Sequence, residues 1–133
     1  MSEERKNILI VEDERQYAEM VKLRLELAGY DCAIAETTQK GVSEMKAGDY
    51  DLIVLDLMLP GGGGFVLLHE LRKDQAKSGI PVVILTGKSI TPEVKAMIGT
   101  FNISALFTKP YDPEKFLSVV NSLINIKSQE GKP

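Results

Sequence analysis

The stretch LIVLD at residues 52–56 decides the fold class, because a short and wholly apolar run is typical of a strand buried on both faces of a sheet. The stretch ILIV at residues 8–11 has the same character, and it is followed by the acidic pair Glu12 and Asp13. In open parallel sheets, ligands bind at the carboxyl ends of the strands, in a crevice between crossovers on opposite faces. The two runs therefore predict an acidic site for a cation, built from Glu12, Asp13 and Asp56.

Strand and helix signals alternate along the rest of the chain. Further apolar runs predict strands at residues 32–35, 82–85 and 105–107. Capping residues and a 3.6-residue period predict helices from Asp13 or Glu14 to Gly29, from Thr37 or Thr38 to Gly48, over residues 65–73, from Thr91 onward and from Asp112 onward. Five strands that alternate with five helices predict one domain with a parallel sheet covered on both faces. We expect this domain over residues 1–127, followed by a polar tail at residues 128–133.

The composition agrees with a single small domain. The chain has 133 residues, of which 44% are hydrophobic, enough to fill one core. A formal net charge of −3, without long runs of like charge, argues against direct nucleic-acid binding by this segment. No stretch approaches the roughly 18 apolar residues of a membrane span, so we expect a cytoplasmic location and no membrane contact. Cys32 is the only cysteine, and its apolar surroundings favour a buried strand residue over a reactive thiol.

The residues at the predicted strand ends are suited to binding a phosphoryl group. Three carboxylates placed together repel one another unless they share a cation, and oxygen ligands favour Mg²⁺. The strand at 82–85 ends in Thr86, and the strand at 105–107 is followed by Lys109. A phosphoryl group held between a cation, a hydroxyl and a lysine would be neutralised, and Asp56 would accept it as an acyl phosphate. Taken singly, Asp13 is equally well a helix cap, and Thr86 and Lys109 are more often ordinary surface residues; the set at one edge carries the argument.

These motifs resemble those of the receiver domains of two-component response regulators. The resemblance runs from residue 8 to about residue 126 and is carried by ILIVED at 8–13, DLMLP at 56–60, LT at 85–86 and TKP at 108–110. It implies a doubly wound α/β fold of the flavodoxin-like kind, with five parallel strands in the order 2-1-3-4-5 and five helices.

The resemblance also implies a role for each matching residue. Asp56 would be the phosphoacceptor, charged by a histidine kinase, a phosphotransfer protein or a small phosphodonor. Asp13 would bind Mg²⁺ directly, Glu12 through a water molecule, and Met58 through its backbone carbonyl.

On the phosphoryl side of the site, Thr86 and Lys109 would contact the phosphoryl group, and the peptide bond before Pro110 would be cis. The output would be a population shift of the surface formed by the helix from residue 92, the strand at 105–107 and the helix from residue 113. That surface would act on an effector protein or on an output domain outside this segment, and it offers a possible homodimer contact. The chain would be a stand-alone regulator, a relay intermediate or part of a larger protein.

The sequence departs from the family pattern at three places. Leu106 stands where many members have an aromatic switch residue, and Phe107 should face the other side of its strand. An extra residue falls between Thr86 and Lys109, and we place it at residues 99–102. The glycine-rich run at 61–64 predicts a loop that is mobile without metal.

Two alternatives to a phosphorylated signalling domain stay open at this point. The first is a pseudo-receiver that binds partners without phosphorylation, for which Leu106 is the only support. The second is a phosphatase or phosphotransferase that works through an aspartyl phosphate. Such enzymes commonly need an aspartate two positions after the nucleophile, where this chain has Met58, so we expect no turnover enzyme.

Overall fold

The computed structural model describes residues 5–59, 63–87 and 90–130, and it has the predicted architecture. Five parallel strands form one sheet in the order β2-β1-β3-β4-β5, so the predicted order 2-1-3-4-5 is confirmed. In chain order the elements are β1 (Asn7–Val11), α1 (Arg15–Leu27), β2 (Asp31–Ala35), α2 (Thr38–Ala47), β3 (Leu52–Leu55), α3 (Gly63–Lys73), β4 (Val82–Thr86), α4 (Pro92–Gly99), β5 (Ala105–Thr108) and α5 (Pro113–Glu130).

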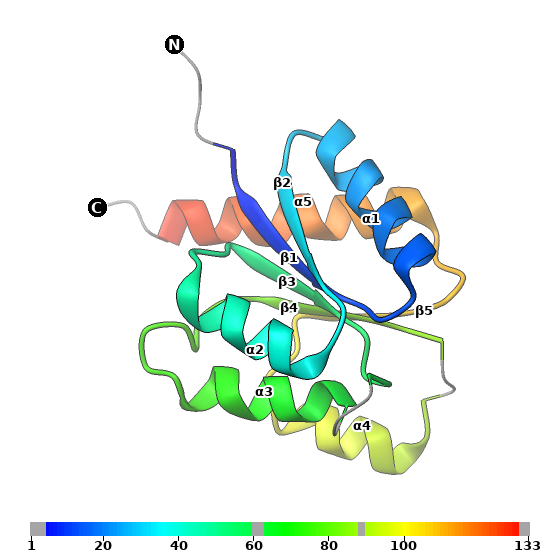
Figure 1. The fold of residues 1–133 in the computed structure, drawn as a ribbon, viewed down its shortest axis with the longest axis vertical. Helices are drawn as coiled ribbons and strands as arrows, with labels where there is room; N and C mark the ends of the chain where they lie inside the picture. The colour runs from blue at the N-terminus through cyan, green and yellow to red at the C-terminus, as the bar shows by residue number, and fades with distance from the viewer. Residues whose placement is uncertain (1–4, 60–62, 88–89, 131–133) are drawn as a thin grey trace.

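Helices cover both faces of the sheet, with α1 and α5 on one side and α2, α3 and α4 on the other (Figure 1). Successive residues of the central strands point to opposite faces. Leu9 of β1 therefore packs towards α2 and α3, and Ile10 packs towards α1 and α5. All four residues of β3 are buried, as the apolar run at 52–55 predicts.

The crossover after β1 and the crossover after β3 run to opposite faces, which opens the sheet edge between these two strands. β1 and β3 pair directly, with Val11 opposite Leu55. The residues that follow these strands are therefore neighbours at the carboxyl edge. Within the described part of the chain, no helix is long and apolar enough to span a membrane.

Side-chain caps fix three of the helix starts where the sequence predicts them. The Thr37 hydroxyl accepts a hydrogen bond from the Lys40 amide at 3.1 Å, and Thr91 accepts one from Val94 at 3.2 Å. Asp112 accepts from the Glu114 amide at 2.9 Å. The first helix differs, because Glu14 precedes it without a side-chain capping bond. The side chain of Glu14 therefore does not cap α1.

The largest differences between the predicted and observed element boundaries are at the start of α3 and the end of α5. α3 begins at Gly63 rather than near Phe65, and the Gly64 amide donates to the Leu57 carbonyl at 2.8 Å. Glycine is a poor helix former, so the sequence did not indicate this early start. α5 continues to Glu130, into the segment 128–133 that was expected to be a polar tail, because no helix breaker occurs before Gly131. Of the run at 61–64 that predicts a mobile loop, residues 61 and 62 lie outside the described residues, whereas Gly63 and Gly64 begin α3.

Arg72 of α3 joins two loops at the amino-terminal edge of the sheet, a contact that sequence reasoning missed. Its guanidinium donates to the carbonyl oxygens of Phe101 at 2.6 Å, Asn102 at 3.0 Å and Ser78 at 2.6 Å. Asn102 lies in the segment where the sequence placed an extra residue, and it has a positive φ of 57°. This set of hydrogen bonds from Arg72, here called the Arg72 clamp, therefore fixes the chain between α4 and β5 in a conformation that few residue types adopt.

Candidate functional site

Three carboxylates meet at the carboxyl edge of β1 and β3. Glu12 and Asp13 follow β1, Asp56 follows β3, and one oxygen from each lies within 4.8 Å of the others. The Asp56 amide donates to the Val11 carbonyl at 3.0 Å, which extends the pairing of the two strands into the site. Glu12 is 4% exposed and Asp56 is 7% exposed, whereas Asp13 lies at the surface. The structure thus brings together the three acidic residues that the sequence singled out.

Asp56 is held by donors from three different segments. The Thr86 hydroxyl donates to its Oδ1 at 3.1 Å, and the Met58 amide donates to the same oxygen at 3.0 Å. The Lys109 ammonium donates to Oδ2 at 3.2 Å. Both carboxylate oxygens are therefore oriented from β4, from the loop after β3 and from the end of β5. The Met58 side chain is half exposed at the rim of the site.

Glu12 is a buried acid with two hydrogen-bond donors. Lys109 donates to its Oε1, and the Glu14 amide donates to its Oε2 at 3.1 Å. Burial raises the pKa of Glu12 from 4.5 to about 7, although the hydrogen bond from Lys109 opposes the rise. Glu12 therefore keeps its proton up to near neutral pH, and a cation that used the same oxygens would have to displace that proton.

Lys109 stands at the centre of the charged groups. Its ammonium contacts Glu12 and Asp56, lies 3.7 Å from the Glu14 carboxylate, and lies 4.3 Å from the centroid of the Tyr17 ring. Burial would lower the pKa of Lys109, but the surrounding carboxylates outweigh it and raise that pKa. The lysine is therefore charged at any pH at which the protein would act.

The backbone at the end of β5 aligns Lys109 with β4. The Lys109 amide donates to the Thr86 carbonyl at 2.9 Å, which continues the pairing of β4 with β5 by one residue. The peptide bond between Lys109 and Pro110 is cis. Thr86 and Lys109 thus lie side by side at the carboxyl edge.

The two residues at the unusual switch position face opposite sides of β5. Phe107 packs edge-to-face against Phe116 of α5, with ring centroids 5.6 Å apart. Leu106 is 37% exposed and belongs to the other face of the strand. The expectation that Phe107 faces the other side of the strand from Leu106 is confirmed.

Tyr17 is a site residue that sequence reasoning missed. Tyr17 fits the 3.6-residue apolar period of α1, which predicts only a packing role, but its ring lies over the Lys109 ammonium. A tyrosine one turn after an acidic strand end was the signal present in the sequence. The signal was weak because nothing in one chain shows which lysine would reach that ring.

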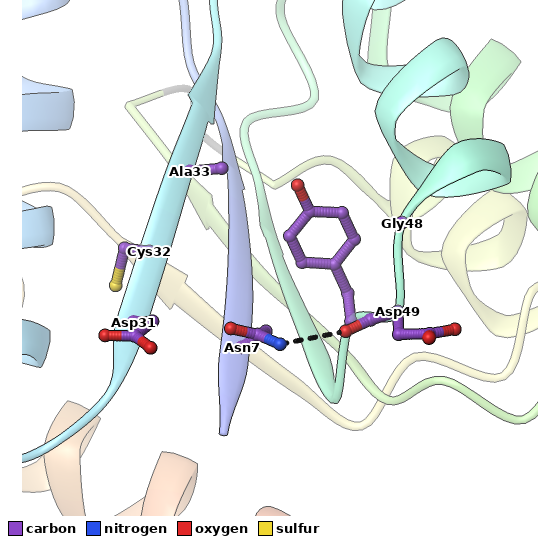
Figure 2. A pocket seen from close by; sticks show the side chains of 7 residues that line it. Asn7, Asp31, Cys32, Ala33, Gly48 and Asp49 are labelled. Carbon is purple, nitrogen blue, oxygen red and sulfur yellow. Dashed lines mark hydrogen bonds between the residues drawn. The ribbon is translucent and has the colours of Figure 1, made fainter. Parts of the chain in front are cut away.

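Figure 2 shows a hollow at the opposite edge of the sheet, where the strands begin. Asn7 lies in it, and its side-chain amide donates to the Asp49 carbonyl at 3.3 Å. Cys32 lies beside it in β2 and is half buried rather than fully buried. Burial raises the pKa of this thiol to about 12, which makes it a poor nucleophile. The group of acidic residues that could hold a metal ion, among the described residues, is therefore the one at the carboxyl edge and not one in this hollow.

Comparison with known proteins assigns the family. A sequence profile described as the response regulator receiver domain matches residues 8–121. The chain belongs to the response regulator receiver domain family. Receiver domains bind Mg²⁺ at an acidic pocket, serve two-component signalling and are generally not turnover enzymes, so the alternatives of a pseudo-receiver and a phosphatase are not favoured.

The relatives are response regulators of about twice this length. The receiver domain is 36% identical over 121 residues to the phosphate regulon transcriptional regulatory protein PhoB of Pseudomonas aeruginosa, covering 90% of this chain and 52% of that protein. It is 33% identical over 124 residues to the response regulator ArlR of Staphylococcus saprophyticus, covering 93% of this chain and 54% of that protein. The chain thus spans about half the length of the curated relatives it matches.

Solved structures show the same fold. The receiver domain superposes with a TM-score of 0.88 on a CheY-like response regulator receiver domain protein from Methanospirillum hungatei, at 26% identity over 96% of this chain and 100% of that chain. A signal receiver domain of a histidine kinase from Syntrophus aciditrophicus gives a TM-score of 0.83 at 29% identity, covering 90% of each chain. Receiver domains of both regulators and kinases are therefore similar to this one.

Proposed function

We propose that this receiver domain accepts a phosphoryl group on Asp56 from the phosphohistidine of a histidine kinase or phosphotransfer protein. The observation that carries the proposal is the convergence of Thr86 and Lys109 on the Asp56 carboxylate beside the acidic cluster. The Thr86 hydroxyl and the Lys109 ammonium already donate hydrogen bonds to the Asp56 carboxylate. They are therefore placed to donate to the oxygens of a phosphoryl group on Asp56. No further residue has to be brought in for transfer.

The donor set fits Mg²⁺. Glu12, Asp13 and Asp56 supply only oxygen atoms, which are the ligands this ion prefers, and the Met58 carbonyl is the proposed fourth protein ligand. Lys109 compensates only part of the negative charge of the three acids. When bound, the ion supplies positive charge that offsets the charge of the phosphoryl oxygens.

In the proposed transfer, a carboxylate oxygen of Asp56 attacks the phosphorus atom of phosphohistidine. The new O–P bond forms as the P–N bond breaks, and the electron pair of that bond stays on the imidazole nitrogen of the donor. Lys109, with a side chain that is 12% exposed, shifts its hydrogen bond to a phosphoryl oxygen, and Thr86 does the same. The buried ammonium and the hydroxyl thereby hold the acyl phosphate.

The phosphoryl donor has to dock where its histidine reaches Asp56, and α1 offers a suitable surface. This helix begins three residues after Glu12. It exposes an apolar row of Met20, Leu23 and Leu27, with 39%, 58% and 81% of each residue accessible. These residues recur at helical spacing, so they form one stripe. We assign this stripe to the helical surface of the kinase or phosphotransfer protein, which acts in the cytoplasm.

The proposed output is a population shift of the surface formed by α4, β5 and α5. Ile98 is the one buried side chain of α4, so this helix is held by few contacts and belongs to the readily displaced part of the fold. With Leu106 in place of an aromatic residue, movement of Thr86 is passed on through the backbone and α4. Met97 and Leu106 are exposed there and supply apolar contacts for an effector, an output domain or a second copy of the domain.

The proposal is tested by intact mass measurement after incubation with acetyl phosphate and Mg²⁺. We expect one labile phosphoryl group on the wild-type chain and on the control variant Asp49→Asn, which changes an exposed acid at the far edge of the sheet. We expect none on Asp56→Asn and none in the presence of a chelator. An unmodified wild-type chain, or a modified Asp56→Asn chain, would contradict the assignment.

A further inference from the structure

We propose that Tyr17 is a positioning residue for Lys109, and that its ring holds the ammonium where it reaches the phosphoryl group on Asp56. The inference deepens the proposed function and rests on it. It concerns where the charge of Lys109 is held, because among the described residues Lys109 is the only cationic side chain that contacts the acidic cluster.

The ammonium of Lys109 lies over the face of the Tyr17 ring. The distance of 4.3 Å from Nζ to the ring centroid is well inside the roughly 6 Å limit for an attractive cation–π contact. The lysine side chain is only 12% exposed, so water screens this attraction weakly. The ring therefore contributes to holding the charge in place, in addition to the bonds with Glu12 and Asp56.

The Tyr17 ring is itself fixed by an aromatic row that reaches the core. Its edge packs against Tyr111 with ring centroids 6.1 Å apart, and Tyr111 packs against the buried Phe116 at 4.9 Å. Arg24 lies over the Tyr111 ring, 5.8 Å from its centroid. Tyr17 therefore stays in place when Lys109 changes partners.

The ring, and not the hydroxyl, is the part of Tyr17 that explains its position. The hydroxyl is buried and finds no hydrogen-bond partner in the part of the chain that the structure describes. An unpaired buried hydroxyl lowers stability, so phenylalanine would serve the fold at least as well. Among the described residues, the contact of its ring face with Lys109 is the polar interaction that the side chain makes.

The ring matters because Lys109 has a competing partner outside the site. The Glu14 carboxylate lies 3.7 Å from Nζ and is 72% exposed. When Glu12 and Asp56 serve as ligands of a cation, they attract the Lys109 ammonium less strongly. The attraction of the Glu14 carboxylate for the same ammonium then becomes relatively more important. The contact with Tyr17 favours the desolvated position next to Asp56 over a hydrated position beside Glu14.

The test compares phosphorylation rates with acetyl phosphate and Mg²⁺. A cation–π contact at a desolvated site predicts that Tyr17→Leu lowers the rate constant about fivefold, while Tyr17→Phe stays near the wild-type value. Adding Glu14→Gln to Tyr17→Leu should restore most of the loss, because it removes the competing charge. In a Lys109→Ala background, Tyr17→Leu should change nothing further.

Two controls separate positioning from damage to the fold. Tyr50→Leu removes a partly buried tyrosine that lines the hollow at the opposite edge of the sheet, and it should leave the rate unchanged. The Mg²⁺ affinity of Tyr17→Leu, measured by calorimetry, should be no weaker than that of the wild type. A distorted site would instead lose both Mg²⁺ affinity and phosphorylation rate. If Tyr17→Leu fails to fold in urea titrations, Tyr17→Met takes its place in the same comparisons.

The outcomes distinguish this inference from the function on which it rests. A wild-type rate for Tyr17→Leu, an equal loss in Tyr17→Phe, or a further loss in the Lys109→Ala background would each overturn the positioning role. A wild-type chain that takes up no phosphoryl group would instead overturn the proposed function.

Discussion

The stability of this receiver domain without divalent cations should fall as the pH rises through neutrality. Glu12 is the cause, since burial raises its pKa from 4.5 to about 7 in the folded state. Between these two values the folded protein binds more protons than the unfolded protein, so raising the pH favours unfolding. The stabilisation is fully present below pH 4.5 and is lost as the pH passes about 7.

The size of the effect follows from the two pKa values. One pKa unit corresponds to about 1.4 kcal/mol, so the free energy of unfolding should drop by about 2 kcal/mol between about pH 5.5 and about pH 8. Small domains are stable by roughly 5–15 kcal/mol, which makes such a change easy to measure. Metal binding should oppose it, because a cation favours the ionised carboxylate.

Urea unfolding at a series of pH values, in the presence of a chelator, measures this change. Glu12→Gln carries no titrating group at this position and should lose the pH dependence that Glu12 causes. Glu26→Gln, a change of an exposed acid on α1, should keep the wild-type slope. Saturating Mg²⁺ should flatten the wild-type curve. Equal slopes for the wild type and Glu12→Gln in chelator would refute the reasoning.

Three further substitutions test other parts of the structure. Arg72→Met should lower the free energy of unfolding by about 1.5–3 kcal/mol in urea, because the partly buried carbonyl groups of Phe101 and Ser78 lose a charged donor. Gly63→Ala should lower the thermal midpoint by an amount equivalent to at least about 1 kcal/mol, since φ is 70° and the new Cβ would lie 2.6 Å from the Leu57 carbonyl oxygen. Thr86→Val should leave Asp56 open to phosphorylation but abolish the accompanying change in hydrogen exchange at α4.

The parts of the molecule that depend on local signals could be predicted from the sequence. The run at 52–55 was assigned as a buried strand from its composition alone, and Thr91 followed by Pro92 marked the start of α4. The candidate site could also be located, because parallel strands end at the same edge whatever their connections are. Asp56 and Lys109 are far apart in sequence, yet this rule places them together.

The parts that depend on contacts between distant side chains could not be predicted. The clamp made by Arg72 and the ring of Tyr17 over Lys109 join residues whose separation leaves no periodic signal. The shift in the pKa of Glu12 has the same origin, since it requires the depth of burial to be known. The glycine start of α3 at Gly63 is a different case, in which packing and the Leu57 carbonyl override a poor local propensity.

The charge balance of the site links protonation, cation binding and phosphorylation. Glu12, Asp13 and Asp56 lie together with Lys109 as the opposing charge, so the site carries an excess of negative charge when all three acids are ionised. A proton on Glu12 reduces this excess, and so does a divalent cation. A phosphoryl group on Asp56 adds to it. A bound cation would therefore favour phosphorylation in a way that a proton on Glu12 would not, because Glu12, Asp13 and Asp56 would hold the cation and its charge would offset that of the phosphoryl oxygens.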